Sequence, residues 1–285
     1  MSAIKLDGEL LAAEIREALL QRISELAQNG ITPGLGTILV GNDGPSENYV
    51  AMKHKDCQEL GMHSQETKLP VTATREDILA AVHSMNNDPQ IHAFIIQYPF
   101  PDGLNYESAL LHVLPHKDAD GLHPVNLGRL VQGVDAPLAC TPAGIQLLLE
   151  RFEVPIAGKH VVIIGRGLTI GRPLANLLSL KKPNANAAVT VVHTGVQNLA
   201  EYTRQADILV AAAGSPGMVT TDMVKPGAAV VAAGVSFDGK KLLSDVSDEV
   251  ETIAGWLSPR IGGVGPMTRA LLMQNTVAAA ESSLS

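Results

Sequence analysis

The stretch that decides the fold of this 285-residue chain reads His160-Val-Val-Ile-Ile-Gly165-Arg166-Gly167-Leu-Thr-Ile-Gly171. Its branched apolar residues form a short run typical of a buried strand, and three glycines follow within seven residues. Glycines let the backbone turn tightly, and the amides of a following helix can hold a pyrophosphate. The pattern predicts a nucleotide-binding turn at Gly165, Arg166 and Gly167, although glycines after a strand also occur in plain turns.

Apolar runs on both sides of this stretch extend the pattern. Downstream, we expect strands at 188–193, 207–213 and 228–233, with helical stretches between the first three strands of the series. Upstream, the chain alternates expected helices at 7–29, 46–60 and 75–87 with expected strands at 36–41, 63–69 and 92–97. Because strands that alternate with helices pair in parallel, the sequence predicts an α/β fold, with a doubly wound, Rossmann-like sheet in the second half.

Several boundaries can be assigned from single residues. Ser46 is the expected N-cap of the helix at 46–60, and Gly61 is expected to end it. Residues 102–141 are expected to be mostly loop and short helix. The chain leaves the strand–helix pattern after residue 245, and a terminal helix is expected at 266–283.

Composition excludes several classes of protein. The formal net charge is −8, which argues against a general nucleic-acid binder, because such a protein needs a basic face. The start of the chain lacks the pattern of a secretion signal, and no apolar run is long enough to span a membrane. Cys57 and Cys140 have no second cysteine or histidine at metal-ligand spacing, so we expect no metal site and a reducing, cytoplasmic setting.

The choice of nucleotide can be argued from the strand at 188–193. NAD-binding proteins of this fold usually carry an acidic residue after that strand, where it accepts from the ribose 2′-hydroxyl. Here the strand is followed by Thr194 and Gly195, and the guanidinium of Arg166 lies in the neighbouring turn. This favours NADP over NAD, although Arg166 could also form a surface salt bridge and His193 could be an ordinary histidine at the core edge.

A second group of residues could carry chemistry in the first half of the chain. Tyr49 and Lys53 are four residues apart on an expected helix and so share one face. A lysine at the border of the core would have a lowered pKa and could transfer protons. By spacing alone, however, such a pair is more often packing beside a solvated amine. Gln97 ends an expected strand, and Asp120 lies in an acidic loop, where capping or turn roles are equally open.

Six segments together resemble the methylenetetrahydrofolate dehydrogenase/methenyltetrahydrofolate cyclohydrolase family. They occur in the order typical of the family and spread over nearly the whole chain. They are Ser46-x-x-Tyr49-Val50-x-x-Lys53-x-Lys55, Gln97-Tyr98-Pro99-Phe100-Pro101, Lys117-Asp118-Ala119-Asp120-Gly121, Cys140-Thr141-Pro142, Gly165-Arg166-Gly167-x-x-x-Gly171-x-Pro173 and Gly262-Gly263-Val264-Gly265-Pro266-Met267-Thr268.

The resemblance implies a role for each matching residue. Lys53 is similar to the catalytic lysine of the family, Tyr49 to the tyrosine that stacks on the folate, and Gln97 to a glutamine beside that lysine. Asp120 resembles the aspartate that binds the pterin edge. Further implied substrate-binding residues are Gly263 and Pro266, and implied cofactor-binding residues are Gly165, Arg166, Gly167, Thr194 and Val235.

The resemblance also implies an architecture. It is that of two α/β domains flanking a cleft, usually in a homodimer, with a folate-binding catalytic domain at 1–142 plus 266–285 and an NADP-binding domain at 143–265. Gly167 and Thr194 stand where many members have serines, so the expectation of NADP depends mainly on Arg166. Ala232-Ala233-Gly234 similarly replaces a common Asp-Val-Gly.

The activity implied is oxidation of 5,10-methylenetetrahydrofolate with NADP, followed by hydrolysis to 10-formyltetrahydrofolate, with Lys53 assisting proton transfer. Two alternatives remain open from the residues. One is a different two-domain NADP dehydrogenase that acts on an amino or hydroxy acid, and the other is a nucleotide sensor without catalysis. The first leaves the segment from Gln97 to Pro101 unexplained, and the second predicts cofactor binding without turnover.

Overall fold

The computed structural model describes residues 3–239 and 241–284 and divides into two compact units. Unit 1 contains the start of the chain up to Ala12, together with Leu130–Val134 and Ala139–Thr268. Unit 2 contains Ala13–Arg129, Asp135–Leu138 and the end of the chain from Arg269. The chain passes from one unit to the other within helices α1 (Gly8–Gln28), α5 (Pro124–Gln132) and α9 (Val264–Ser282).

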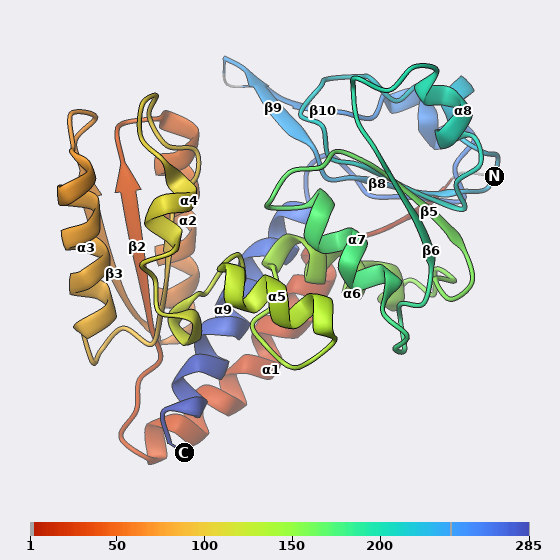
Figure 1. Cartoon of the computed structure of the whole chain (residues 1–285). Coiled ribbons are helices and arrows are strands. Elements are labelled where there is room, and N and C mark those ends of the chain that lie inside the picture. The colour runs from red at the N-terminus through yellow and green to blue at the C-terminus, as the bar shows by residue number, and fades with distance from the viewer. Residues whose placement is uncertain (1–2, 240, 285) are drawn as a thin grey trace. The chain divides into compact units, whose positions relative to one another are not determined.

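Unit 1 is built on a six-stranded sheet in which all the paired neighbours are parallel. The strand order is β1-β11-β8-β7-β5-β6, with the bounds β1 Ile4–Lys5, β5 His160–Ile164, β6 Ala188–Val192, β7 Ile208–Ala211, β8 Ala229–Ala232 and β11 Trp256–Leu257. Figure 1 shows α6 (Cys140–Arg151) and α7 (Gly171–Ser179) on one side of this sheet and α8 (Leu199–Thr203) on the other. The predicted parallel, Rossmann-like sheet is therefore confirmed.

The apolar runs explain why the central strands of unit 1 form where they do. Residues 161–164, 208–211 and 229–232 are all buried, as expected for parallel strands covered on both faces. Ile164 ends β5 level with Val192 of β6 and Ala211 of β7, so the carboxyl ends of three strands meet at one edge. Ligands of open parallel sheets bind at this edge.

Two parts of unit 1 differ from the sequence prediction. The chain returns to the sheet after residue 245, because β11 pairs with β8, and β1 then pairs with β11. Strands of two residues are too short to leave a periodic signal in the sequence. A hairpin formed by β9 (Val235–Asp238) and β10 (Lys241–Ser244) was also not predicted.

Unit 2 contains a three-stranded parallel sheet in the order β3-β2-β4. The bounds are β2 Gly34–Val40, β3 His63–Leu69 and β4 Ala93–Ile96. In Figure 1, α2 (Gly44–Leu60) and α4 (Tyr106–Leu110) lie on one side of this sheet and α3 (Arg75–Asn87) on the other. The expected alternation of strands and helices in this half of the chain is confirmed.

The start of α2 corrects the prediction that Ser46 is its N-cap. The N-cap is Asp43, whose carboxylate accepts from the Ser46 amide at 3.0 Å and from the Ser46 hydroxyl at 2.6 Å. A carboxylate satisfies the first-turn amides well, and Pro45 is tolerated there because it has no N–H to satisfy. The end of α2 agrees with the prediction, since Gly61 has a left-handed φ of 71° and donates to the carbonyls of Cys57 and Gln58.

The expected helix at 266–283 is α9, which begins two residues earlier, at Val264. Within the described residues, no helix combines the length and the hydropathy that crossing a bilayer requires.

Candidate functional site

The amine of Lys53 and the side chain of Gln97 are in direct contact in unit 2. Lys53 Nζ donates to Gln97 Oε1 at 2.9 Å, and both side chains are partly buried. The two residues are 44 positions apart in the sequence and come from a helix and a strand end. The structure thus brings together two of the predicted site residues.

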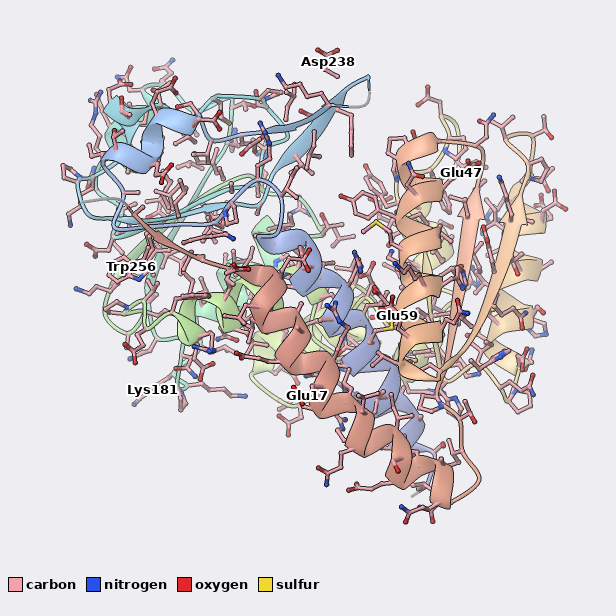
Figure 2. All side chains as sticks on the ribbon, turned by 180° about the vertical axis from the view of Figure 1, so that it is seen from behind. Glu17, Glu47, Glu59, Lys181, Asp238 and Trp256 are labelled. Atoms are coloured by element: carbon pink, nitrogen blue, oxygen red, sulfur yellow. The ribbon has the colours of Figure 1, made fainter. Side chains whose placement is uncertain are left out.

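Helix α2 explains why Lys53 lies at the border of the core. Three buried residues form an apolar stripe along α2, namely Val50, Cys57 and Leu60. Lys53 follows Val50 by three residues and therefore lies beside this stripe. Figure 2 labels Glu47 and Glu59 near the two ends of α2, and Lys53 lies midway between them in the sequence. Tyr49 stands one turn before Lys53 on the same helix.

The charge of Lys53 also acts on its sequence neighbour. His54 Nε2 lies 2.9 Å from the Thr37 hydroxyl on β2, which holds the ring against the sheet. Burial lowers the pKa of His54, Glu66 opposes that change, and the positive charge of Lys53 adds to it. A neutral imidazole beside the lysine is the expected state at neutral pH.

Gln97 is held at the carboxyl end of β4 by its own backbone and side chain. Its amide donates to the carbonyl of Ile38 on β2 at 2.8 Å, and its Nε2 donates to the Tyr98 carbonyl at 2.6 Å. Because the side-chain nitrogen is used in this way, the amide oxygen is the group that faces Lys53. The Tyr98–Pro99 peptide bond that follows is cis, and β4 ends before it, as the prolines predict.

The acidic loop of residues 117–121 lies against the same strand. Asp118 forms a parallel bridge with Phe94 of β4, so Asp120 follows two residues later in a turn. Asp118 is buried and accepts from the His123 amide at 2.7 Å and from Asn126 Nδ2 at 2.9 Å. Burial raises the pKa of Asp118, while these hydrogen bonds oppose the rise. The loop that carries Asp120 is therefore fixed by its neighbouring carboxylate.

An aromatic cluster beside this loop was missed by the sequence analysis. Tyr106 is buried, and its ring meets those of Tyr98 and Phe100 edge to face at centroid distances of 5.3 and 5.5 Å. Burial raises the pKa of Tyr106, and the charges of Asp120 and Asp118 add to the effect, so this phenol stays protonated. The cluster connects the loop after Gln97 with the neighbourhood of Asp120, a contact between segments that no spacing in the sequence reveals.

The nucleotide turn of unit 1 is closed by two glycines. Gly165 has a φ of 128°, and a Cβ there would overlap the carbonyl oxygen of Ala212, so only glycine fits. A Cβ on Gly171 would overlap the carbonyl oxygen of Gly165, which shows that α7 starts directly against the turn. Gly167 differs, because an added Cβ would meet no atom within 4 Å.

The start of α7 has the features of an anion-binding site. Its N-cap, Ile170, makes no side-chain capping hydrogen bond in the described structure. The Arg172 amide donates to the Gly167 carbonyl at 3.2 Å and Pro173 has no N–H, so the Gly171 amide is the donor that the first three residues of α7 can offer a ligand. Arg166 and Gly167 are exposed in the turn just before it. Amides at a helix start, together with a guanidinium, suit the phosphates of a nucleotide.

The end of β6 borders the same turn. The Gly165 amide donates to the carbonyl of Val192, the last residue of β6, at 2.8 Å. His193 and Thr194 follow, and His193 Nδ1 accepts from the Gly195 amide at 3.1 Å. The residues beside the turn therefore include an exposed hydroxyl from Thr194 and no carboxylate.

The remaining predicted residues also lie in unit 1. Val235 begins the hairpin directly after β8. Gly263 is packed so closely that a Cβ would overlap the carbonyl oxygen of Pro259, and Pro266 lies in the first turn of α9. The Thr141 and Thr268 hydroxyls are 2.9 Å apart, which joins the starts of α6 and α9.

The predicted residues thus fall into two sets. Tyr49, Lys53, Gln97 and Asp120 belong to unit 2, and the nucleotide turn, Thr194, Val235, Gly263 and Pro266 belong to unit 1. Among residues 3–239 and 241–284, no group of three His, Cys, Asp or Glu side chains is arranged to hold a metal ion.

Comparison with known proteins gives matches over nearly the whole chain. Residues 6–120 match the catalytic domain of tetrahydrofolate dehydrogenase/cyclohydrolase, and residues 139–284 match the NAD(P)-binding domain of the same family. The bifunctional protein FolD of Syntrophotalea carbinolica is 54% identical over 281 residues, which cover 99% of this chain and 97% of that protein.

Two solved structures share the fold throughout. The bifunctional FolD enzyme of Campylobacter jejuni is 38% identical with a TM-score of 0.94, covering 99% of this chain and 100% of that one. The Trypanosoma brucei methylenetetrahydrofolate dehydrogenase-cyclohydrolase, complexed with NADP cofactor and an inhibitor, is 34% identical with a TM-score of 0.94, covering 100% of this chain and 99% of that one.

Proposed function

Because the chain belongs to the tetrahydrofolate dehydrogenase/cyclohydrolase family, we propose that it oxidises 5,10-methylenetetrahydrofolate with NADP and then hydrolyses the product. The observation that carries the proposal is the 2.9 Å hydrogen bond from Lys53 to Gln97. Both residues lie in the segment that matches the catalytic domain of the family. A lysine oriented by an amide oxygen is suited to proton transfer at a reacting carbon and its nitrogens.

The proposed reaction has two steps, in which atoms and charges balance. In the first, a hydride leaves the bridging carbon, and the two neighbouring nitrogens stabilise the 5,10-methenyl cation that remains. NADP, when bound, supplies the hydride acceptor for this step. In the second, water adds to the methenyl carbon, the bond from that carbon to N5 breaks, and one proton is released, giving 10-formyltetrahydrofolate.

Lys53 is assigned the proton transfers of the second step. Its amine removes a proton from the attacking water or delivers one to N5 as the ring opens, and Gln97 keeps the amine pointed at the substrate. Tyr49 is assigned to stacking on the folate, and Asp120 to the pterin edge, where a carboxylate accepts from two adjacent N–H donors. Gly263 and Pro266 are assigned as further folate contacts.

The cofactor residues are assigned in the same way. Gly165 and Gly167 are assigned to the close approach of the backbone to the pyrophosphate, Arg166 and Thr194 to the 2′-phosphate, and Val235 to the nicotinamide side. The absence of a carboxylate after β6 and the guanidinium in the turn support NADP over NAD. The NADP bound to the similar Trypanosoma brucei enzyme also supports this choice.

We assign folate binding and NADP binding to different segments of the chain. Residues 1–142 plus 266–285 form the folate-binding catalytic domain, and residues 143–265 form the NADP-binding domain. Expressing residues 143–265 alone tests this division, since that fragment should bind NADP and should not hydrolyse the methenyl substrate.

One assay tests the activity itself. The chain is incubated with 5,10-methylenetetrahydrofolate and either NADP or NAD, while NADPH or NADH formation and the methenyl absorbance are followed in parallel. We expect reduced cofactor to form faster with NADP and the methenyl signal to decay to 10-formyltetrahydrofolate. Cofactor binding without turnover would instead identify a nucleotide sensor, and turnover of an amino or hydroxy acid would identify the rival dehydrogenase.

We also infer that the enzyme works as a homodimer in the cytoplasm, as the family resemblance implies. Sedimentation velocity should then give twice the 30.0 kDa mass of the chain. A single species of 30.0 kDa at assay concentration would contradict the dimer.

A further inference from the structure

Asp245 is a fully buried carboxylate to which the proposed reaction gives no role. Its exposed fraction is 0%, and it follows β10 directly. Its Oδ2 accepts from the amides of Ala213 and Gly214 at 2.7 and 2.9 Å, and its Oδ1 accepts from the amide of Ser215 at 2.6 Å. Burying a charge is costly unless it is hydrogen-bonded, so three consecutive amides account for the presence of this carboxylate in the interior.

These three amides belong to a loop that starts beside the nucleotide turn in space. It follows β7, and the preceding residue, Ala212, donates to the carbonyl of Ile164 at 2.7 Å. The Ala212 carbonyl is also the group that Gly165 packs against without room for a Cβ. Any shift of the loop would therefore move the wall on which the nucleotide turn rests.

The other side of the carboxylate touches the connection after β8. A Cβ on Gly234 would overlap Asp245 Oδ2, and the Asp245 amide donates to the Gly234 carbonyl at 3.2 Å. Gly234 precedes Val235, the residue assigned to the nicotinamide side. One carboxylate thus contacts the two strand-end connections that flank Gly165 and Val235.

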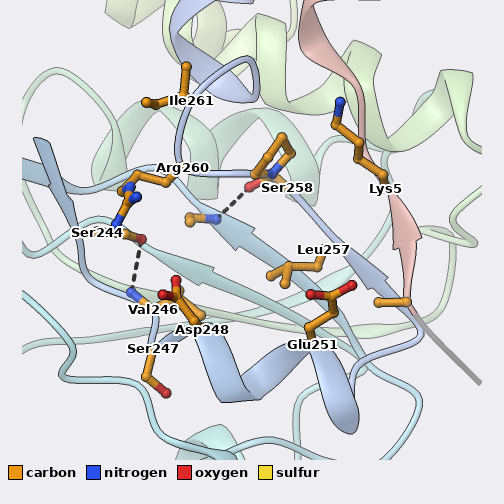
Figure 3. Close-up of a pocket in the computed structure, with 13 residues that line it drawn as sticks. Lys5, Ser244, Val246, Ser247, Asp248, Glu251, Leu257, Ser258, Arg260 and Ile261 are labelled. Atoms are coloured by element: carbon orange, nitrogen blue, oxygen red, sulfur yellow. Dashed lines mark hydrogen bonds between the residues drawn. The ribbon is translucent and has the colours of Figure 1, made fainter.

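The segment that carries Asp245 is held by its backbone, because the carbonyls of Ser244 and Asp245 accept from the amides of Gly217 and Val219 at 2.8 and 2.9 Å. Figure 3 shows the Ser244 hydroxyl beside the amide of Val246, which donates to it at 3.1 Å, and the Ser258 hydroxyl, which accepts from the Ala232 amide at 2.8 Å. These residues line a pocket of about 430 Å³ next to the segment. The backbone around Asp245 is therefore fixed independently of its side chain, so the carboxylate can act as a fixed point for the loops.

We propose that Asp245 is a positioning residue for the cofactor. Its carboxylate holds the loop of residues 213–215 and the Gly234–Val235 connection at a fixed separation, and this fixes the surface that NADP contacts. A carboxylate suits the task because both oxygens only accept hydrogen bonds, whereas an amide would turn an N–H group toward another N–H. The inference rests on the proposed function, since it concerns the cofactor of that reaction.

The first test is Asp245→Asn, measured in both half-reactions. The KM for NADP should rise by about 10- to 100-fold, as expected when hydrogen bonds to a charged group are lost. The hydrolysis of added methenyl substrate needs no hydride acceptor, so its kcat and KM should stay within about twofold of wild type. This split separates a positioning role from general loss of structure, which would lower both activities together.

A second variant approaches the same contact from the other side. Gly234→Ala keeps the carboxylate, but the new Cβ would overlap Asp245 Oδ2 and displace it from its hydrogen-bonding position, so the variant should raise the KM for NADP in the same way. The double variant should be little worse than either single one, because both remove one interaction. If Asp245→Asn does not fold, Gly234→Ala decides the question alone.

The matched control is Asp207→Asn. Asp207 also accepts from a backbone amide, that of His160 at 3.0 Å, but at the opposite edge of the same sheet. The control should leave the KM for NADP unchanged. An unchanged KM for NADP in Asp245→Asn and in Gly234→Ala would overturn the inference, whereas failure of the wild-type chain to oxidise the folate with NADP would overturn the proposed function instead.

Discussion

The two units use different materials to build their proposed sites. In unit 1 the predicted nucleotide turn is made of backbone: Gly165 and Gly171 leave no room for a side chain, and the Gly171 amide lies at the start of α7. In unit 2 the proposed chemistry depends on side chains, with the amine of Lys53 held by the amide of Gln97 at 2.9 Å. The backbone site tolerates no added atom at Gly165 or Gly171, and the side-chain site tolerates no change of functional group at Lys53.

The two sites should also differ in how a substitution changes the stability of the protein. A glycine with positive φ contributes through the conformation it alone can adopt, so replacing it strains the whole turn. A catalytic lysine contributes through one proton at one atom, so replacing it can leave the fold intact. Substitutions at the tightly packed glycines of the turn should therefore affect stability and binding together, and substitution of Lys53 should separate chemistry from stability.

The largest effect is expected for Lys53→Met. Loss of the only group assigned to proton transfer should slow hydrolysis of the methenyl substrate by about 100- to 10,000-fold, while the thermal midpoint changes little. The control is Lys55→Met on the same helix, which removes an exposed amine 3.6 Å from Glu59 and should leave hydrolysis unchanged. Near-normal hydrolysis by Lys53→Met would remove this residue from the mechanism.

A smaller effect is expected for Gly165→Ala. The new methyl group would overlap the Ala212 carbonyl and force the turn to move, and a displacement of about 1 Å can cost about 100-fold in rate. NADP-dependent oxidation should fall by that order and the thermal midpoint should drop, while hydrolysis continues. Gly167→Ala is the structural contrast, because its methyl group meets no atom and should leave the thermal midpoint unchanged. Equal thermal midpoints for the two variants would contradict the steric argument.

Arg166→Ala should change selectivity more than rate. If the guanidinium meets the 2′-phosphate, its loss should lower the ratio of kcat/KM for NADP to that for NAD about tenfold, the lower end of what a charged hydrogen bond contributes. Lys181→Ala removes the same charge elsewhere in unit 1 and serves as the control. An equal fall of this ratio in both variants would mean that the preference for NADP depends on the overall positive charge of unit 1 and not on Arg166 itself.

The smallest effect is expected for Asp207→Asn, and it should depend on pH. The hydrogen bond from Lys225 at 2.7 Å, followed by that from the His160 amide, lowers the pKa of Asp207 in the folded state. A lowered folded-state pKa stabilises the fold above the ordinary Asp pKa near 4, and that stability is lost as the pH falls through the folded-state value. Because the pair is largely exposed, the variant should lose at most about 1 kcal/mol at pH 7.

Urea unfolding at several pH values measures this effect. The difference between wild type and Asp207→Asn should shrink as the pH falls below about 4, where the unfolded chain becomes protonated, and should vanish below the lowered folded-state pKa, where Asp207 is protonated in both states. A difference that persists undiminished at low pH would show that the variant acts through something other than the charge.

The contrast between backbone and side chains also explains what could be predicted from the sequence. The strand, the glycines and the helix at residues 160–171 are local, so their pattern predicted both the fold of unit 1 and its turn. The pair formed by Lys53 and Gln97 is not local. Its spacing on the helix favoured an ordinary lysine, and only the ordered set of matching segments indicated otherwise.

The missed features are those whose cause lies far away in the chain. The N-cap of α2 is the local exception, because Asp43 and Ser46 are both good N-cap residues and the structure shows that Asp43 satisfies the first turn. Tyr106 joins Tyr98 only through tertiary packing. Strands β1 and β11 are two residues long, and each forms because a neighbouring strand is already in place. Nothing in the sequence distinguishes Asp245 from other acidic residues, because its three amide partners lie about 30 residues away.

The pairing of β1 with β11 has a consequence for how the protein is made. Ile4 pairs with Trp256, and Leu6 donates to the carbonyl of Leu257 at 2.9 Å, so β1 finds its partner strand only after the residues between them have been translated. At about 5–20 residues per second, the ribosome takes on the order of ten seconds to a minute to deliver that partner. During this interval β1 has no partner strand, and it can join its edge of the unit 1 sheet only after β11 has been made.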